Sequence, residues 1–167
     1  GHIGYQAPGL VPIRQRVPDS PVPTDGTWPR PGWDSRYDWQ GFVPPEDLPA
    51  VQDPPEGYVV AANQAVTVSG QGPFLAVDWD YGYRSQRIRT LLDEAIAAGT
   101  PVDAALMSRI QSDAWSPYAD VLVPALLQVR VDAFTQEAVD LLRDWDGQQS
   151  ADSAAAAYLA AVWSTLL

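Results

Sequence analysis

Asn63 and Arg84 are the two side chains whose type and surroundings best fit a role in chemistry. Asn63 follows a short apolar run, residues 58–62, which lies between a Pro-Pro-Glu-Gly turn signal and Gln64. Such a run predicts a buried strand, with Asn63 at the strand's end. An asparagine in that position has two uses. It can be a turn former whose side chain bonds its own backbone, or a fixed amide N–H donor directed at a site.

Arg84 stands at the start of a helical pattern and carries several hydrogen-bond donors in one planar group. Arg87 and Arg89 follow on the same expected helix. The alternative for Arg84 is therefore a solvated arginine on a helix surface, and the local pattern alone does not choose between the two.

Other chemistries find little support in the composition. His2 is the only histidine and has no second histidine or cysteine to make a metal site with it. The chain holds 21 acidic residues against 10 arginines, with no lysine, and its net charge of −11 argues against nucleic acid and anionic membranes as partners. No apolar run reaches the roughly 18 residues of a membrane span. Thiol catalysis is excluded because the chain has no cysteine.

The first 56 residues differ in composition from the rest. Most of the 16 prolines lie at or before Pro55, and these fix the backbone and remove N–H donors. Residues 1–6 predict the end of a strand, and residues 7–49 predict an extended surface segment. Aromatic side chains in that segment are expected to pin it onto a neighbouring layer: Trp28, Trp33, Tyr37, Trp39 and Phe42.

The remaining sequence predicts short strands followed by helices, an α+β arrangement. Strands are expected at residues 58–62, 65–69 and 74–77. About five helices are expected at residues 83–98, 101–112, 116–133, 135–145 and 154–167, from apolar spacing and from cap and stop residues such as Thr100 and Gly99. Pro124 should kink or split the third of these.

Four motifs resemble, in order and spacing, the penicillin acylase family of N-terminal-nucleophile amidohydrolases. They are GHIGY at residues 1–5, DWQGFVP at 38–44, PPEGYVVAAN at 54–63, and DW at 78–79 followed by Arg84. The resemblance covers essentially the whole chain. It implies that residues 1–167 are an interior fragment of the β subunit, within a four-layer α-β-β-α fold. The fragment would comprise an extended part at 1–56, strands bearing Asn63 at 57–80, and a helical part at 81–167.

The same resemblance implies the chemistry. Such an enzyme uses a Ser, Thr or Cys, exposed by autoproteolysis as the first residue of its chain, whose α-amino group is the general base. Gly1 has no such side chain, so the nucleophile is expected on the remainder of the acylase chains, and the fragment alone should be inactive. By motif position Asn63 matches the family's oxyanion-hole asparagine, and Arg84 matches an arginine close to the nucleophile. The substrate would be a small acyl amide, and the resemblance favours a secreted or periplasmic location.

No cofactor is expected. In the resembling family the turn at residues 70–73 often carries an aspartate that binds a structural calcium, but Gln71, Gly72 and Pro73 supply no carboxylate. Asp78 and Asp80 lie nearby and are equally suited to capping the next helix. We therefore expect no tightly held calcium in these residues.

A non-enzymatic interpretation of the sequence also remains open. The chain could be a proline-rich binding or scaffold module in which Asn63 only forms a turn. The parent reading frame distinguishes the two, because a Ser, Thr or Cys after a glycine at an upstream self-cleavage junction favours the enzyme.

Overall fold

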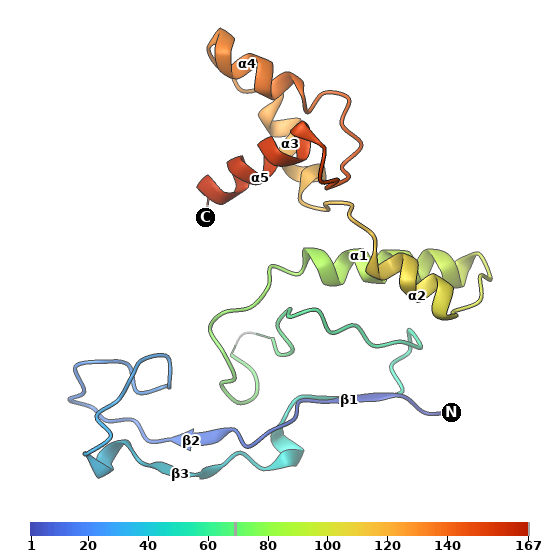
Figure 1. The fold of residues 1–167 in the computed structure, drawn as a ribbon. Coiled ribbons are helices and arrows are strands. Elements are labelled where there is room, and N and C mark those ends of the chain that lie inside the picture. The colour runs from blue at the N-terminus through green and yellow to red at the C-terminus, as the bar shows by residue number, and fades with distance from the viewer. Residues whose placement is uncertain (69, 167) are drawn as a thin grey trace. The chain divides into compact units, whose positions relative to one another are not determined.

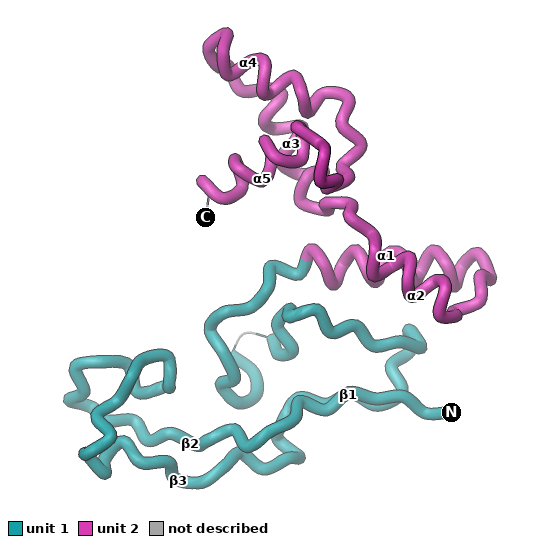
Figure 2. Tube along the Cα trace, viewed as in Figure 1, with its two compact units in different colours: residues 1–82 teal, residues 83–167 magenta. Residues whose placement is uncertain are grey.

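The computed structural model describes residues 1–68 and 70–166 and divides the chain into two compact units, Gly1–Gly82 and Tyr83–Leu167 (Figure 2). The first unit holds the strands and the second holds the α-helices. Each unit is described on its own.

The first unit contains two small antiparallel ladders (Figure 1). Strand β1 (Gly4–Gln6) pairs with β4 (Ala50–Gln52), and β2 (Pro12–Arg14) pairs with β3 (Trp39–Phe42) across an irregular register. Pro12 occupies the first position of its strand, where a missing N–H is tolerated. Two 3₁₀ turns, Ser35–Tyr37 and Pro45–Asp47, flank β3. The expected strand at the chain's start is thereby confirmed, as is the presence of short strands in the first half, although β2 and β3 lie within residues 7–49, where an extended surface segment was expected.

The strands expected within residues 57–80 are wrong for the described residues there. Residues 58–62, 65–68 and 74–77 lie outside any strand, and the described part of 57–80 forms a single parallel bridge between Gln64 and Asp80. Ser69, which the second expected strand included, lies outside the described residues. The physical reason is that positive φ angles recur along this stretch, at 78° for Gly57, 65° for Asn63 and 78° for Gly70. Each reverses the backbone before an extended run can pair.

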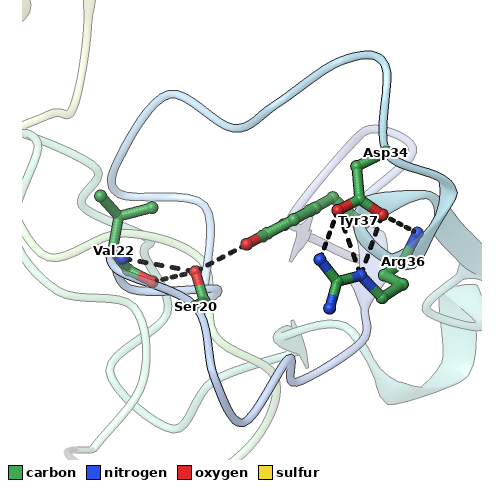
Figure 3. Close-up of polar contacts among 5 residues, drawn as sticks. All are labelled: Ser20, Val22, Asp34, Arg36 and Tyr37. Atoms are coloured by element: carbon green, nitrogen blue, oxygen red, sulfur yellow. Dashed lines mark hydrogen bonds and ion pairs between the residues drawn. The ribbon is translucent and has the colours of Figure 1, made fainter.

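Fewer aromatic side chains of the proline-rich segment are buried than expected. Tyr37 is buried, and its hydroxyl donates to Ser20 Oγ at 3.0 Å, while Ser20 Oγ donates to the carbonyl of Val22 at 2.7 Å (Figure 3). Trp28, Trp33, Trp39 and Phe42 are exposed in this structure. One aromatic side chain therefore anchors the segment by burial, and the other four remain at the surface.

The five expected helices are present in the second unit: α1 (Tyr83–Ala97), α2 (Ala104–Gln111), α3 (Ala119–Leu126), α4 (Ala133–Asp140) and α5 (Ala154–Leu166). Gly99 follows α1 with φ of 65°, the left-handed stop that glycine favours. The cap of α2 is Asp103 and not Thr100, because the Asp103 carboxylate accepts the N–H of Leu106 at 2.8 Å.

The third and fourth helices are shorter than expected. The pattern predicted a helix running to about Ala133 that Pro124 kinks or splits near Val121, but α3 continues from Ala119 through Pro124 and ends at Leu126. A proline inside a helix removes one backbone hydrogen bond and crowds the preceding turn. Asp132 then caps α4 by accepting the N–H of Thr135 at 2.7 Å, which starts that helix before the expected residue.

The core of the second unit lies among α3, α5 and the turns after α4. Leu159 and Leu142 are 0% and 1% exposed and pack with Ala119 and Ala155. Within the described residues, no helix combines the length and apolar character needed to cross a bilayer.

Candidate functional site

The backbone of Asn63 is in the left-handed region, with φ of 65°. Its carbonyl accepts the N–H of Asp80 at 2.9 Å, beside the bridge between Gln64 and Asp80. Asparagine adopts this conformation more readily than most residues that carry a Cβ. Two segments separated by 17 residues of sequence therefore fix the peptide that follows Asn63.

Gln64 holds the backbone on the other side of Asn63. Its Oε1 accepts the N–H of Ala62 at 2.7 Å, and its Nε2 donates to the carbonyl of Val60 at 2.7 Å. These are backbone groups that a strand would have used for pairing. Asn63 is thus placed between two clamped segments, and its residue is exposed.

Arg84 is the second residue of α1 and is also exposed. The chain entering this helix is shaped by Asp80, whose Oδ1 accepts the N–H of Gly82 at 3.0 Å, and by Gly82 itself at φ of 87°. Asn63 belongs to the first unit and Arg84 to the second, and the structure defines each within its own unit.

A charged cluster on α1 was not found from the sequence. Arg87 makes two bonds to Asp113, from Nε to Oδ2 at 2.7 Å and from Nη2 to Oδ1 at 2.9 Å. Its guanidinium also lies over the ring of Trp115, 4.5 Å from the centroid. The bond from Arg87 lowers the pKa of Asp113, and the bond from Asp113 raises the pKa of Arg87. No local motif signals a pair that is 26 residues apart.

Arg87→Lys should weaken the packing of α1 against the segment that carries Asp113. A lysine keeps the charge but loses the second bond and the flat stack over Trp115, so we expect a loss of about 1–2 kcal/mol in local stability. Hydrogen exchange of the α1 amides in the parent protein would measure it, with Arg109→Lys, an exposed arginine on α2, as the matched control.

The same pair should respond to acid. The pKa of Asp113 is lower in the folded state than its unfolded value near ~3.9, so its contribution is complete above that value and is lost as the pH falls through the folded pKa. Asp113→Asn should abolish that acid-dependent loss. An unchanged acid response in Asp113→Asn would contradict the assignment.

His2 forms a structural contact with a carboxylate. Its Nδ1 lies 2.7 Å from Asp53 Oδ2, and Asp53 Oδ1 accepts the N–H of Ile3 at 3.0 Å. The N–H of Asp53 donates to the carbonyl of Ile3 at 2.8 Å, which extends the β1–β4 ladder. His2 is thus bonded to the end of this ladder, and its ring is exposed to solvent, unlike the buried ring of a typical general base.

One of the two carboxylates considered for calcium, that of Asp80, has another use. Asp80 binds the backbone of Gly82 through its side chain and that of Asn63 through its N–H. Within the described residues, no group of three or more His, Cys, Asp or Glu side chains is arranged to hold a metal ion.

Comparison with solved structures defines the class of fold. The chain matches penicillin G acylase from Alcaligenes faecalis with a TM-score of 0.55 and 21% sequence identity, over 89% of this chain and 26% of that one. The expected fold class is confirmed: the chain is a mixed α+β piece with the fold of penicillin G acylase, which is the N-terminal-nucleophile hydrolase fold.

The family follows from sequence. The family model for penicillin amidase matches residues 1–167, and the chain belongs to that family. It is 35% identical over 146 residues to penicillin acylase 2 proenzyme of Pseudomonas sp. (strain SE83), covering 86% of this chain and 18% of that protein. It is 33% identical over 171 residues to acyl-homoserine lactone acylase QuiP of Pseudomonas aeruginosa, covering 93% of this chain and 19% of that protein. The chain therefore spans about a fifth of the length of these relatives.

Proposed function

We propose that this chain is part of an enzyme that cleaves an acyl chain from an amide by N-terminal-nucleophile catalysis. In this proposal it supplies Asn63 as an oxyanion donor and Arg84 as a site arginine. The observation that carries the proposal is the clamped left-handed backbone at Asn63, with Asp80 on one side and Gln64 on the other. Residues held in sparsely populated backbone regions cluster at active sites, since the fold has to over-determine them.

The chemistry asks for such a fixed donor. When a nucleophile attacks the amide carbonyl, its proton passes to the α-amino base and negative charge develops on the carbonyl oxygen. An amide N–H that is already positioned stabilises this charge without reorganisation, and one such donor contributes about 2.7–4 kcal/mol to the barrier. The side chain of Asn63 offers two N–H donors from a backbone that cannot easily shift.

Arg84 is the second residue that we assign to the site. A guanidinium presents five N–H donors in a planar fork, so it can donate hydrogen bonds to an amide oxygen and to the nucleophile at the same time. The neighbouring Arg87 is bound to Asp113 and stacked on Trp115, so we do not assign it to the site; the arginine that we assign is Arg84, the second residue of α1. This assignment also rests on the position of Arg84 in the family motif.

The names of the relatives indicate the type of bond that is cleaved, but not a particular substrate. Penicillin acylase and acyl-homoserine lactone acylase are both named for the removal of an acyl group. We propose an amide between an acyl chain and a polar amine, such as a β-lactam nucleus, a homoserine lactone or a lipopeptide. The nucleophile and the remaining pocket walls would come from the remainder of the acylase chains, and no cofactor is required.

Release of a primary amine from N-acyl β-lactams and N-acyl homoserine lactones by the processed parent protein tests this proposal. Arg84→Lys should lower kcat in that assay by roughly tenfold, because a single ammonium cannot reproduce the planar fork. Arg89→Lys on the same helix is the matched control and should be close to wild type. Equal kcat values for Arg84→Lys and Arg89→Lys would show that Arg84 is a surface arginine without a role in the site. If the parent protein released no amine from any N-acyl substrate, the proposed function itself would be contradicted.

A further inference from the structure

The long loop between β2 and β3, residues 15–38, carries Arg30, which lies between two tryptophans in the sequence. Pro29 and Pro31 restrict the backbone on either side of Arg30, and the indoles of Trp28 and Trp33 are 58% and 90% exposed. We call residues 28–33 the tryptophan tip. Figure 1 shows the loop extending beyond the β2–β3 pair.

The guanidinium of Arg30 is buried and unsatisfied. Its Nε, Nη1 and Nη2 atoms are all buried, and none has a hydrogen-bond partner among the described residues. A guanidinium has five donors and stays charged in proteins. An unpaired buried charge of this kind is strongly unfavourable, so a fold retains it only where something else completes it.

Two of the four carboxylates of the same loop, those of Asp25 and Asp34, are already occupied. Asp25 Oδ1 accepts the N–H of Thr27 at 2.9 Å and its hydroxyl at 2.7 Å. Asp34 holds Arg36 through both oxygens, with Arg36 Nη2 at 2.6 Å from Oδ2 (Figure 3). The pKa of Asp25 is lowered first by Thr27 and least by Arg30, as expected for a charge that lies near it without bonding to it.

We propose that the tryptophan tip docks onto another segment of the parent protein, which presents an Asp or Glu carboxylate to Arg30 between Trp28 and Trp33. A planar carboxylate matches the guanidinium by two parallel bonds. Tryptophan and arginine are also the residues that most often dominate protein contacts.

A protein segment fits better than a small ligand for two reasons. The occupant has to cover two exposed indoles as well as reach Arg30, which is a surface and not a single anion. The chain also spans about a fifth of its relatives' length, so the parent offers further sequence for this role. Arg30 makes no hydrogen bond that would be lost when its side chain turns toward such a partner. The proposal does not depend on the roles assigned to Asn63 and Arg84.

The absence of lysine from residues 1–167 allows a direct test in the full-length parent. Arg30→Lys places a single lysine amine in this stretch, and a zero-length carbodiimide couples an amine to a carboxylate in contact with it. Mass spectrometry should find one dominant link, from residue 30 to an Asp or Glu outside residues 1–167. Arg16→Lys, at an exposed position of the same loop, is the control and should give no dominant link. A link to Asp25 or another acid within residues 1–167, or no link at all, would overturn the proposal.

The sign of a stability change gives a second, independent readout. If a carboxylate of the parent completes Arg30, Arg30→Met strands that carboxylate and lowers the parent's Tm by several degrees, while Arg16→Met leaves it unchanged. If no partner exists, Arg30→Met removes an uncompensated charge and raises Tm, which contradicts the proposal. An Arg30-dependent rise in wild-type Tm on adding acetate or citrate would show a free anion as the occupant, and would overturn docking as well.

Discussion

Asn63→Gly in the processed parent enzyme should lower kcat by about 10²–10³ and leave KM nearly unchanged. The amide of Asn63 would bond the oxygen only as its charge develops, so its removal affects the barrier and not ground-state binding. Glycine is the appropriate replacement because Asn63 has a φ of 65°, which glycine adopts without strain. Steady-state kinetics on processed enzyme would measure the effect. Processing itself has to be checked first, because self-cleavage passes through a similar tetrahedral species.

Asn63→Ala separates the side chain from the backbone. Alanine removes the same amide and adds a strain of about 1–2 kcal/mol in the left-handed region, so its Tm should fall below that of Asn63→Gly while kcat is equally low. Asn63→Asp keeps the shape but places an acceptor where a donor is needed, and should be the least active of the three. Wild-type kcat in Asn63→Gly together with low kcat in Asn63→Ala would make Asn63 a turn residue and not a donor.

Leu159→Ala should have the largest effect on stability. Leu159 is 0% exposed in α5 and packs with Leu142 and Ala119, so its truncation leaves a cavity costing about 2–5 kcal/mol. Hydrogen exchange of the α5 amides in the parent should show protection lower by at least about 30-fold, the equivalent of about 2 kcal/mol.

Leu166→Ala is the matched control for that change. Leu166 lies on the same helix but is 62% exposed, and its truncation should alter α5 protection by less than about threefold. Equal effects from Leu159→Ala and Leu166→Ala would show that α5 does not contribute this core.

The helices could be predicted because their signals are local. Gly99 ends α1 where expected, whereas the cap Asp132 was missed and α4 begins two residues before the expected Thr135. The apolar spacing also marked Leu122 and Leu126, which pack against the core of the second unit. The error at the start of α2 arose because Asp103 caps the helix in place of Thr100. Pro124 does not account for the end of α3 at Leu126, because a proline disturbs the turn before it.

The strands depend on partners far along the chain, and the sequence predicted them less well. Val59 and Val60 look like a strand by residue type, yet Gln64 takes the backbone groups around them and Asn63 turns the chain. The strands that do form pair residues 25 to 48 positions apart, from Arg14 with Trp39 to Gly4 with Gln52. Propensity is a weak guide to such pairing.

In the candidate site, too, contacts between residues far apart in the sequence could not be predicted. Asn63 was expected at the end of a strand that does not form, and its left-handed backbone and its bond to Asp80 required the structure. The Arg87–Asp113 pair and the unsatisfied Arg30 also required it, since neither has a local signature. The catalytic roles of Asn63 and Arg84 remain predictions from the family motif and from the clamped turn.

A crystal structure of the processed parent enzyme with a phosphonate or boronate bound to its nucleophile tests the central claim most directly. Such a group mimics the tetrahedral species and places an oxygen where the oxyanion forms. We predict Asn63 Nδ2 at about 2.7–3.1 Å from that oxygen, with the φ of Asn63 still positive. An Asn63 side chain directed away from the oxygen, with other donors completing the site, would contradict the account.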